Sequence, residues 1–160
     1  MTSKSRKNKS KQGSVTVNKK VYRDYELIEN FEAGIVLLGS EVKSLRAGGA
    51  NLDGSYARIE GQQCWLVGAN IAQYDKAGVG NHEPTRRRKL LLHKIQISRI
   101  KIKLEQRGFT LVPLRIYFNK RSLVKIELAL ARGKRQYDKR KTITERTQKR
   151  DIDRDMKKYR

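Results

Sequence analysis

Residues 128–141, with the sequence L-A-L-A-R-G-K-R-Q-Y-D-K-R-K, change character at Gly133. Before Gly133 the segment is the end of an apolar alternating run, which indicates a strand with apolar surface to bury. After Gly133 it is basic and carries one aromatic residue, Tyr137. A segment with high net charge and few apolar residues cannot offset the entropy of folding by burial. We therefore predict a folded body that ends near Gly133 and a basic tail that does not fold alone.

Three elements are predicted in the first third of the chain. Residues 14–18, S-V-T-V-N, alternate and indicate a short edge strand. The apolar residues between Tyr22 and Leu38 predict one long strand, bent at Gly34 because glycine permits a bulge or a close backbone approach. Residues 41–46 predict a short helix, with Ser40 as its cap and Gly48 at its end.

Two hairpins are predicted further along. Residues 55–74 alternate on both sides of a turn at Gly61, and residues 109–118 and 123–131 flank the turn N-K-R-S. Residues 75–84 are polar and contain glycine, which is typical of a loop. Residues 90–106 fit helical spacing and also partly alternate, and their isoleucines favour a strand. The length of this segment and the glycine at 108 lead us to predict a helix.

The predicted strands are joined mostly by local connections, and the two or three helices do not alternate regularly with them. This order argues against a doubly wound sheet. It favours a mainly β fold with minor α content. For residues 14–132 we predict a small closed antiparallel β-barrel of the oligonucleotide-binding type.

Charge narrows the choice of partner. The chain has 38 lysines and arginines against 16 acidic residues, a net charge of +22 and a sequence pI of about 10.4. Neutralising phosphates releases counterions and gives affinity for nucleic acid whatever its sequence. An anionic membrane is the rival polyanion, but no apolar run is long enough for a membrane helix and no apolar segment follows the basic N-terminus. The single cysteine, Cys64, excludes an internal disulfide and agrees with a reducing compartment, so we expect a cytoplasmic protein.

The charge is densest at the two ends. Residues 1–13 have five basic residues and no acid, and residues 132–160 have 13 basic and five acidic residues. We predict that residues 1–13 are a disordered basic arm and that residues 133–160 are a tail, disordered alone. In the tail Ile152, Met156 and Tyr159 lie at i, i+4 and i+7, a stripe too thin to hold a helix in water.

Six collinear motifs together resemble one family, the small protein B family of SsrA-RNA-binding proteins in bacterial trans-translation. The motifs are F-E-A-G-I at 31–35, E-V-K-S-L-R-A-G at 41–48, G-A-N-I at 68–71, P-T-R-R-R-K-L-L-L at 84–92, T-L-V-P-L-R-I-Y-F at 110–118, and A-L-A-R-G-K-R-Q-Y-D-K-R at 129–140. The resemblance covers residues 14–160.

The resemblance implies an RNA-binding adaptor without a catalytic site or cofactor. It implies a monomer that binds the tRNA-like domain of transfer-messenger RNA (SsrA RNA) and enters stalled ribosomes with it. The tail would become helical in the vacant messenger channel, near the decoding centre of the small subunit. Elongation factor Tu would be an indirect partner, through the aminoacylated RNA.

The resemblance also implies which residues make these contacts. Carried over by position, the RNA contacts are Asn18, Lys19, Glu32, Arg86, Arg88, Lys89, Leu91, Lys134 and Arg135. The contacts of the tail with the ribosome and the decoding region are Tyr137, Asp138, Lys139, Arg140, Ile152 and Met156.

Without the resemblance, several of these contacts have alternatives. Glu32 could accept a hydrogen bond from a base edge or a ribose hydroxyl, or be a solvated carboxylate. Residues 86–89 are four consecutive cations joined to an apolar run, which favours a phosphate clamp over a solvated face. Leu91 could face RNA or belong to the core, although three adjacent leucines cannot all face one way on a strand.

Other classes of function have less support. His82, His93 and Cys64 lack metal-ligand spacing, so we expect no metal site. No nucleotide-binding glycine motif and no Ser-His-acid constellation stands out, so an enzyme acting on nucleic acid is a distant third hypothesis. A structural ribosomal protein that binds ribosomal RNA is the main alternative, because charge alone does not distinguish it from an adaptor.

Overall fold

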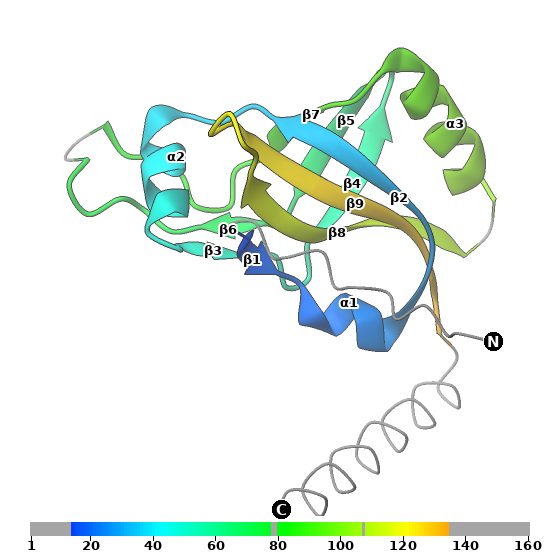
Figure 1. Cartoon of the computed structure of the whole chain (residues 1–160). Helices are drawn as coiled ribbons and strands as arrows, with labels where there is room; N and C mark the ends of the chain where they lie inside the picture. The colour runs from blue at the N-terminus through cyan, green and yellow to red at the C-terminus, as the bar shows by residue number, and fades with distance from the viewer. Residues whose placement is uncertain (1–13, 78–79, 107, 135–160) are drawn as a thin grey trace, which may run out of the picture.

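The computed structural model describes residues 14–77, 80–106 and 108–134 (Figure 1). No helix within these ranges is long and apolar enough to cross a membrane. The elements are β1 (Ser14–Val17), α1 (Lys19–Asp24), β2 (Tyr25–Ile35), α2 (Gly39–Arg46), β3 (Ala50–Asn51), β4 (Tyr56–Glu60), β5 (Gln63–Val67), β6 (Asn70–Ile71), β7 (Arg88–Leu91), α3 (Lys94–Leu104), β8 (Phe109–Phe118) and β9 (Val124–Gly133).

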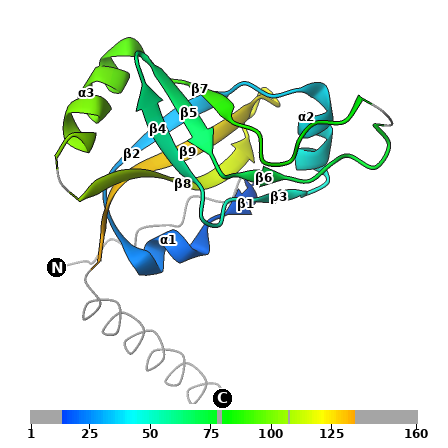
Figure 2. The same ribbon diagram turned by 180° about the vertical axis from the view of Figure 1, so that it is seen from behind.

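Seven of the described strands form one antiparallel sheet, in the order β1-β8-β4-β5-β7-β2-β9. The last strand, β9, also pairs with β8, so the pairings lead from β8 through β4, β5, β7 and β2 to β9 and back to β8. Figures 1 and 2 show the strong curvature of β2, β8 and β9 that accompanies this arrangement. Strands β3 and β6 form a separate two-stranded sheet. The prediction of a mainly β, antiparallel fold with two or three helices is confirmed, and the described residues contain three helices.

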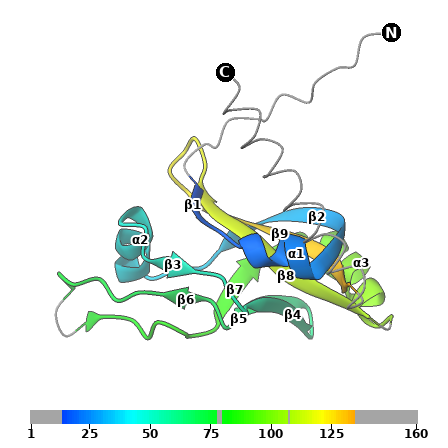
Figure 3. The ribbon, with the colours of Figure 1, turned by 90° about the horizontal axis from the view of Figure 1, so that it is seen from below.

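The run L-A-L-A of β9 is buried on both of its faces. Leu128 and Leu130 pack in the main core. Ala129 and Ala131 pack in a second cluster with Val21 of α1. Because side chains alternate across a strand, large residues fill one side of β9 and small residues leave room for the helix on the other. Figure 3 shows α1 lying against β8 and β9.

Helix α1 and a shorter β2 replace the long strand predicted from Tyr22 to Leu38. Asn18 caps the helix, because its Oδ1 accepts the Val21 N–H at 3.4 Å. The prediction was wrong over this helix because only Val21 of its six residues is buried, too few to give a helical period. The irregularity in the β2–β9 pairing lies between Leu27 and Glu29 and not at Gly34.

Helix α2 is longer than predicted and begins differently. Its N-cap residue is Leu38, whose N–H donates to Oε2 of Glu41 at 2.7 Å. The Ser40 hydroxyl, predicted as the cap, instead lies 2.9 Å from Nδ1 of buried His82. This contact ties the start of α2 to the loop between β6 and β7.

The ambiguous segment 90–106 contains both kinds of structure. Leu90 and Leu91 belong to β7, and a helix follows from Lys94 to Leu104. The single predicted helix is therefore wrong at its start and right from Lys94 on. The predicted hairpins are confirmed, with β4 and β5 joined at Gly61 (φ +60°) and β8 and β9 joined at residues 119–123.

Candidate nucleic-acid interface

The outer face of β7, β2, β9 and β8 brings the predicted contacts Glu32 and Leu91 together. Strand pairing aligns Leu91 with Gly34, Gly34 with Lys125, and Lys125 with Tyr117. Leu90 points into the core, so its neighbour Leu91 faces outward and is 53% exposed. Glu32 lies two residues before Gly34 on the same face of β2. We call this surface, defined by Glu32, Gly34, Leu91, Tyr117 and Lys125, the outer face.

Gly34 leaves space for Leu91. A Cβ at position 34 would lie 3.2 Å from the Leu91 Cβ, closer than ordinary packing. Beside Leu91 is an open, mostly apolar groove of about 500 Å³, bounded by β2, α2 and the β8–β9 turn. Its lining includes Leu37, Val42, Leu123 and Lys125. An exposed leucine beside a groove and a lysine can contact the apolar part and the phosphate of one nucleotide.

Glu32 is exposed but is not an isolated carboxylate. It accepts a hydrogen bond from the Tyr117 hydroxyl, and the Lys125 Nζ lies 3.4 Å from its other oxygen. The hydrogen bond from Tyr117, together with the positive charge of Lys125, lowers the pKa of Glu32. Burial and the bond to Glu32 raise the pKa of Tyr117 to about 12. The pair therefore holds an ionised carboxylate and a protonated phenol at neutral pH, which fixes Glu32 as a hydrogen-bond acceptor.

One charged pair, between Arg115 of β8 and Glu127 of β9, borders this network. The Arg115 Nε donates to Glu127 at 2.6 Å, and Asn30 donates to the same carboxylate at 3.2 Å. The Arg115 guanidinium lies 4.9 Å from the centre of the Tyr117 ring. Arginine and tyrosine are therefore stacked on the outer face, where aromatic and guanidinium planes can contact an unpaired base.

The four cations at 86–89 do not form one clamp. Arg88 is fully buried, and its Nε donates to Oε1 of Glu41 at 2.8 Å. Its other nitrogens donate to the carbonyl oxygens of Ala69 at 2.7 Å and Pro84 at 2.8 Å. Every nitrogen of the Arg88 guanidinium is inside the protein and partnered, so the structure gives Arg88 a role in holding this cluster, and its contact with RNA stays a prediction.

Glu41 is the centre of this buried cluster. Besides Arg88 it accepts hydrogen bonds from Nε of Arg86 at 2.8 Å and from the Leu38 N–H. Burial alone would raise the pKa of Glu41, but the hydrogen bonds from Arg86, Leu38 and Arg88 outweigh it, so the pKa lies below its ordinary value. The cluster fastens the segment before β7 to the start of α2.

Arg87 and Lys89 lie outside the cluster. Arg87 donates to Glu60 at 2.5 Å, and its guanidinium is 5.4 Å from the centre of the Trp65 ring. Lys89 is half-buried and opposite Trp65 in the β5–β7 pairing. Arg86 is 27% exposed while bound to Glu41. Direct contact of Arg86 and Lys89 with RNA stays a prediction.

Asn18, Lys19 and Lys134 lie around α1, apart from the groove. The Asn18 side chain is buried, accepts the Val21 N–H, and donates to the Leu52 carbonyl at 3.0 Å. In the structure Asn18 caps α1, and its direct contact with RNA stays a prediction. Lys19 is exposed in the first turn of α1.

Lys134 continues β9 beside α1. Its N–H donates to the Asp24 carbonyl at 3.0 Å and its Nζ to the Tyr22 carbonyl at 3.3 Å. It lies at the opposite end of β2 from Leu91, about 30 Å away along the strand. The remaining predicted residues lie outside the described part of the chain: Arg135, Tyr137, Asp138, Lys139, Arg140, Ile152 and Met156.

Sequence reasoning missed Tyr117, Lys125 and Glu41 as parts of this arrangement. Glu41 stands at the start of a predicted helix, where an acid is ordinary, so its burial had no signal. Tyr117 and Lys125 could have been found by pairing the second hairpin, because the register places them opposite each other.

A strongly basic, mainly antiparallel β protein, with an exposed leucine, a fixed carboxylate and an arginine stacked on a tyrosine on one sheet face, is of the class that binds nucleic acid. Comparison with known proteins places it more narrowly. The model of the family described as SmpB protein matches residues 15–158. The chain belongs to this family.

Its relatives match over nearly their whole length. An SsrA-binding protein of Syntrophobacter fumaroxidans is 53% identical, over 89% of this chain and 88% of the relative. One of Thermosipho africanus is 47% identical, over 91% of this chain and 95% of the relative. A solved structure described as "tmRNA-SmpB: a journey to the center of the bacterial ribosome" contains a chain that is 48% identical, with a TM-score of 0.66, covering 80% of this chain and 93% of that one.

Proposed function

We propose that the chain is an RNA-binding adaptor of trans-translation, which binds transfer-messenger RNA and carries it into stalled ribosomes. The observation that carries the proposal is the match along residues 15–158 to a family whose solved relative is described with tmRNA and the bacterial ribosome. The outer face supports it, because it combines an apolar contact, an acceptor and cations as recognition of folded RNA loops requires.

In this proposal the outer face contacts the tRNA-like domain of the RNA. Leu91 and its groove would take an unstacked base or ribose, Glu32 would accept from a hydroxyl or base edge, and Lys125 and Lys89 would contact phosphates. Lys19 and Lys134 would contact the phosphate backbone of the RNA beyond the outer face. The ring of pairings from β8 round to β9 would act as a closed barrel of the oligonucleotide-binding type.

The tail has a separate function in the proposal. Residues after Lys134 would enter the messenger channel and approach the decoding centre, with the predicted tail contacts supplying cations and the Tyr137 ring. Elongation factor Tu would meet the adaptor only through the aminoacylated RNA. All of these partners lie in the cytoplasm, which we propose as its location.

The test is comparative binding. The purified chain carries a label placed away from Cys64, whose thiol is buried. It is titrated with the tRNA-like domain of transfer-messenger RNA and with an elongator tRNA at the same salt concentration. We expect markedly tighter binding to the first RNA, with an affinity for both that falls as salt rises. Equal affinity for the two RNAs, combined with constant occupancy of all ribosomes, would favour a structural ribosomal protein.

A further inference from the structure

The outward side of α3 carries two exposed isoleucines. Ile95 is 83% exposed and Ile102 is 63% exposed, the highest values among the large apolar side chains of the described residues. They are seven residues apart in an eleven-residue helix, so they stand on the same face, two turns apart. Ser98 and Arg99 lie between them. We call these four residues the α3 ridge.

The two isoleucines of the ridge do nothing for the fold. The opposite side of α3 packs on the body through Ile97, which is 8% exposed, and Ile100, which is fully buried. Glu29 of β2 adds ion pairs to Arg99 at 2.9 Å and Lys103 at 2.7 Å. Because β-branched residues are also slightly unfavourable in helices, two exposed isoleucines bring no stability to α3. A surface that covers them would explain why they are there.

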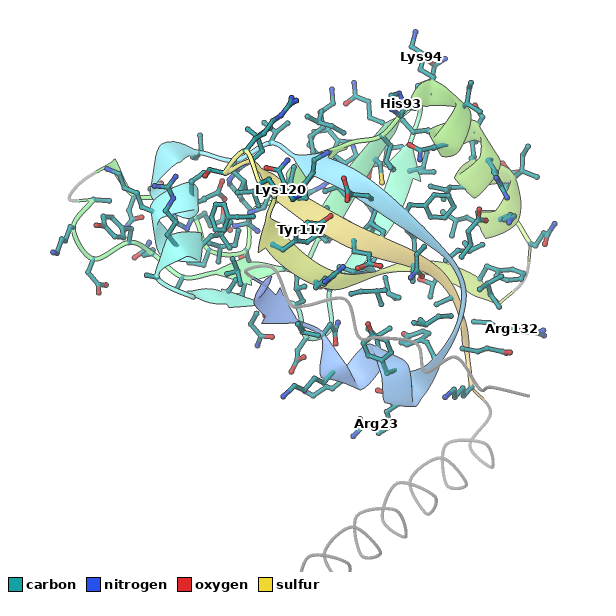
Figure 4. The ribbon with its side chains drawn as sticks, in the orientation of Figure 1. Arg23, His93, Lys94, Tyr117, Lys120 and Arg132 are labelled. Atoms are coloured by element: carbon teal, nitrogen blue, oxygen red, sulfur yellow. The ribbon has the colours of Figure 1, made fainter. Side chains whose placement is uncertain are left out.

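The charge of the helix indicates what kind of surface that is. The sequence of α3, KIQISRIKIKL, contains four cations and no acid. A second copy of the chain would place these cations opposite each other, which disfavours self-association through the ridge. Helix α3 lies at one end of the molecule, away from α2, and Lys94 at its start points away from the body (Figures 1 and 4). The ridge is therefore open to a partner while the outer face is occupied.

We propose that the α3 ridge docks on a protein that offers an apolar depression rimmed by acidic residues. Leu91 lines a groove that can hold a base or ribose, whereas Ile95 and Ile102 project from an exposed helix face and have no ring to stack on a base. RNA would therefore use the lysines of α3 and leave the two isoleucines without a function. An anionic membrane is a poor match, because two isoleucines on three turns give little apolar surface to insert. Since the proposed function brings the chain to the ribosome, the partner would be a protein component of the stalled ribosome, and this part of the inference rests on that function.

The test separates the isoleucines from the cations. The variant I95S/I102S and the variant K94Q/K101Q are each bound, with transfer-messenger RNA, to purified ribosomes stalled on a truncated message. We expect I95S/I102S to bind ribosomes about tenfold more weakly or worse, because two buried side chains lose their apolar contact. Its affinity for the RNA alone and its thermal unfolding should be unchanged. The matched control is I28S, which alters a half-exposed isoleucine of β2 and should bind like the wild type.

A photo-crosslinking residue at position 98, in the full chain on the same ribosomes, identifies the neighbour. Crosslinks to a ribosome-associated protein at an acidic, apolar surface would support the proposal. The proposal would be overturned in favour of phosphate contact if crosslinks formed only to RNA, and if K94Q/K101Q lost ribosome binding while I95S/I102S kept it. Crosslinks to a second copy, or binding of I95S/I102S equal to wild type, would also overturn it. Failure of the wild type to bind ribosomes would instead refute the proposed function, and the docking site with it.

Discussion

At the scale of single residues, Glu41 is a buried carboxylate that holds two arginines. It is fully buried and neutralises Arg88, which is also fully buried and has no other acidic partner among the described ion pairs. Removing one member of a buried pair leaves the other charge uncompensated, a change that costs about 3–5 kcal/mol. The second arginine, Arg86, would lose its anchor at the same time.

We therefore expect E41Q to lower the free energy of unfolding by about 3–5 kcal/mol, measured by urea denaturation with circular dichroism. The control is E60Q, which removes an exposed carboxylate that pairs with Arg87 and should leave the midpoint almost unchanged. Equal stability of E41Q and wild type would contradict the assignment of Glu41 as the centre of the cluster.

The difference between E41Q and wild type should depend on pH. The pKa of Glu41 is lower in the folded protein than its ordinary value of 4.5, so the unfolded chain takes up the proton first as pH falls. The stabilisation by ionised Glu41 is fully present above about pH 5 and is lost as pH falls through the folded pKa. The gap between the two proteins should narrow in that acid range, and a gap that stays constant would contradict this.

Leu90 and Leu91 are adjacent in β7 and should behave oppositely. Leu90 is buried, so L90A should cost about 2–5 kcal/mol of stability through loss of apolar contact and cavity formation. Leu91 is half-exposed on the outer face, so L91A should change stability little and weaken binding of transfer-messenger RNA. Thermal unfolding and RNA titration of both variants test this. An L91A chain with full RNA affinity would remove Leu91 from the proposed interface.

At the scale of elements, α1 depends on a residue outside it. Asn18 caps the helix and bonds to the Leu52 carbonyl, so N18A removes two hydrogen bonds and leaves that buried carbonyl without this donor. We expect a loss of about 1–3 kcal/mol in stability. Amide hydrogen exchange should rise first in residues 19–24. Unchanged exchange in α1 would show that the cap does not hold the helix.

The elements also show which parts of the fold could be predicted from the sequence. The two hairpins were predictable, because long alternating runs flank short turns and pairing follows from the turn. Helix α1 was not, because a six-residue helix with one buried residue gives no period. The break between β7 and α3 was missed because Leu90 fits the core pattern of either structure.

The residues of the candidate site also divide into those that could be predicted from the sequence and those that could not. Glu32 and Leu91 were placed by family motifs, and the structure puts both on one face. Arg88 belongs to the same motif as Leu91, and Asn18 was carried over by position from outside the six motifs, yet both side chains are buried. A family resemblance does not distinguish a residue that touches a ligand from one that holds the surrounding loop, because substitution of either residue impairs the function. Only burial and partners separate them.

At the scale of the whole molecule, the chain should divide in function near Lys134. Strand β9 ends at Gly133, and the N–H of Lys134 donates to the Asp24 carbonyl beside α1. A chain ending after Lys134 should therefore fold, with thermal unfolding like that of the full chain, and bind transfer-messenger RNA. It should not support peptide tagging on stalled ribosomes in a reconstituted translation system. Equal loss of RNA binding and tagging would contradict a two-part molecule.

The central claim is that this chain binds one tRNA-like RNA through the outer face. The most direct measurement is to purify the full chain from cells under mild conditions and sequence the RNA that accompanies it, with L91A purified in parallel. We expect transfer-messenger RNA to be the most enriched RNA with wild type and to be depleted with L91A. Ribosomal RNA in stoichiometric amounts, with no enrichment of a tRNA-like RNA, would contradict the claim.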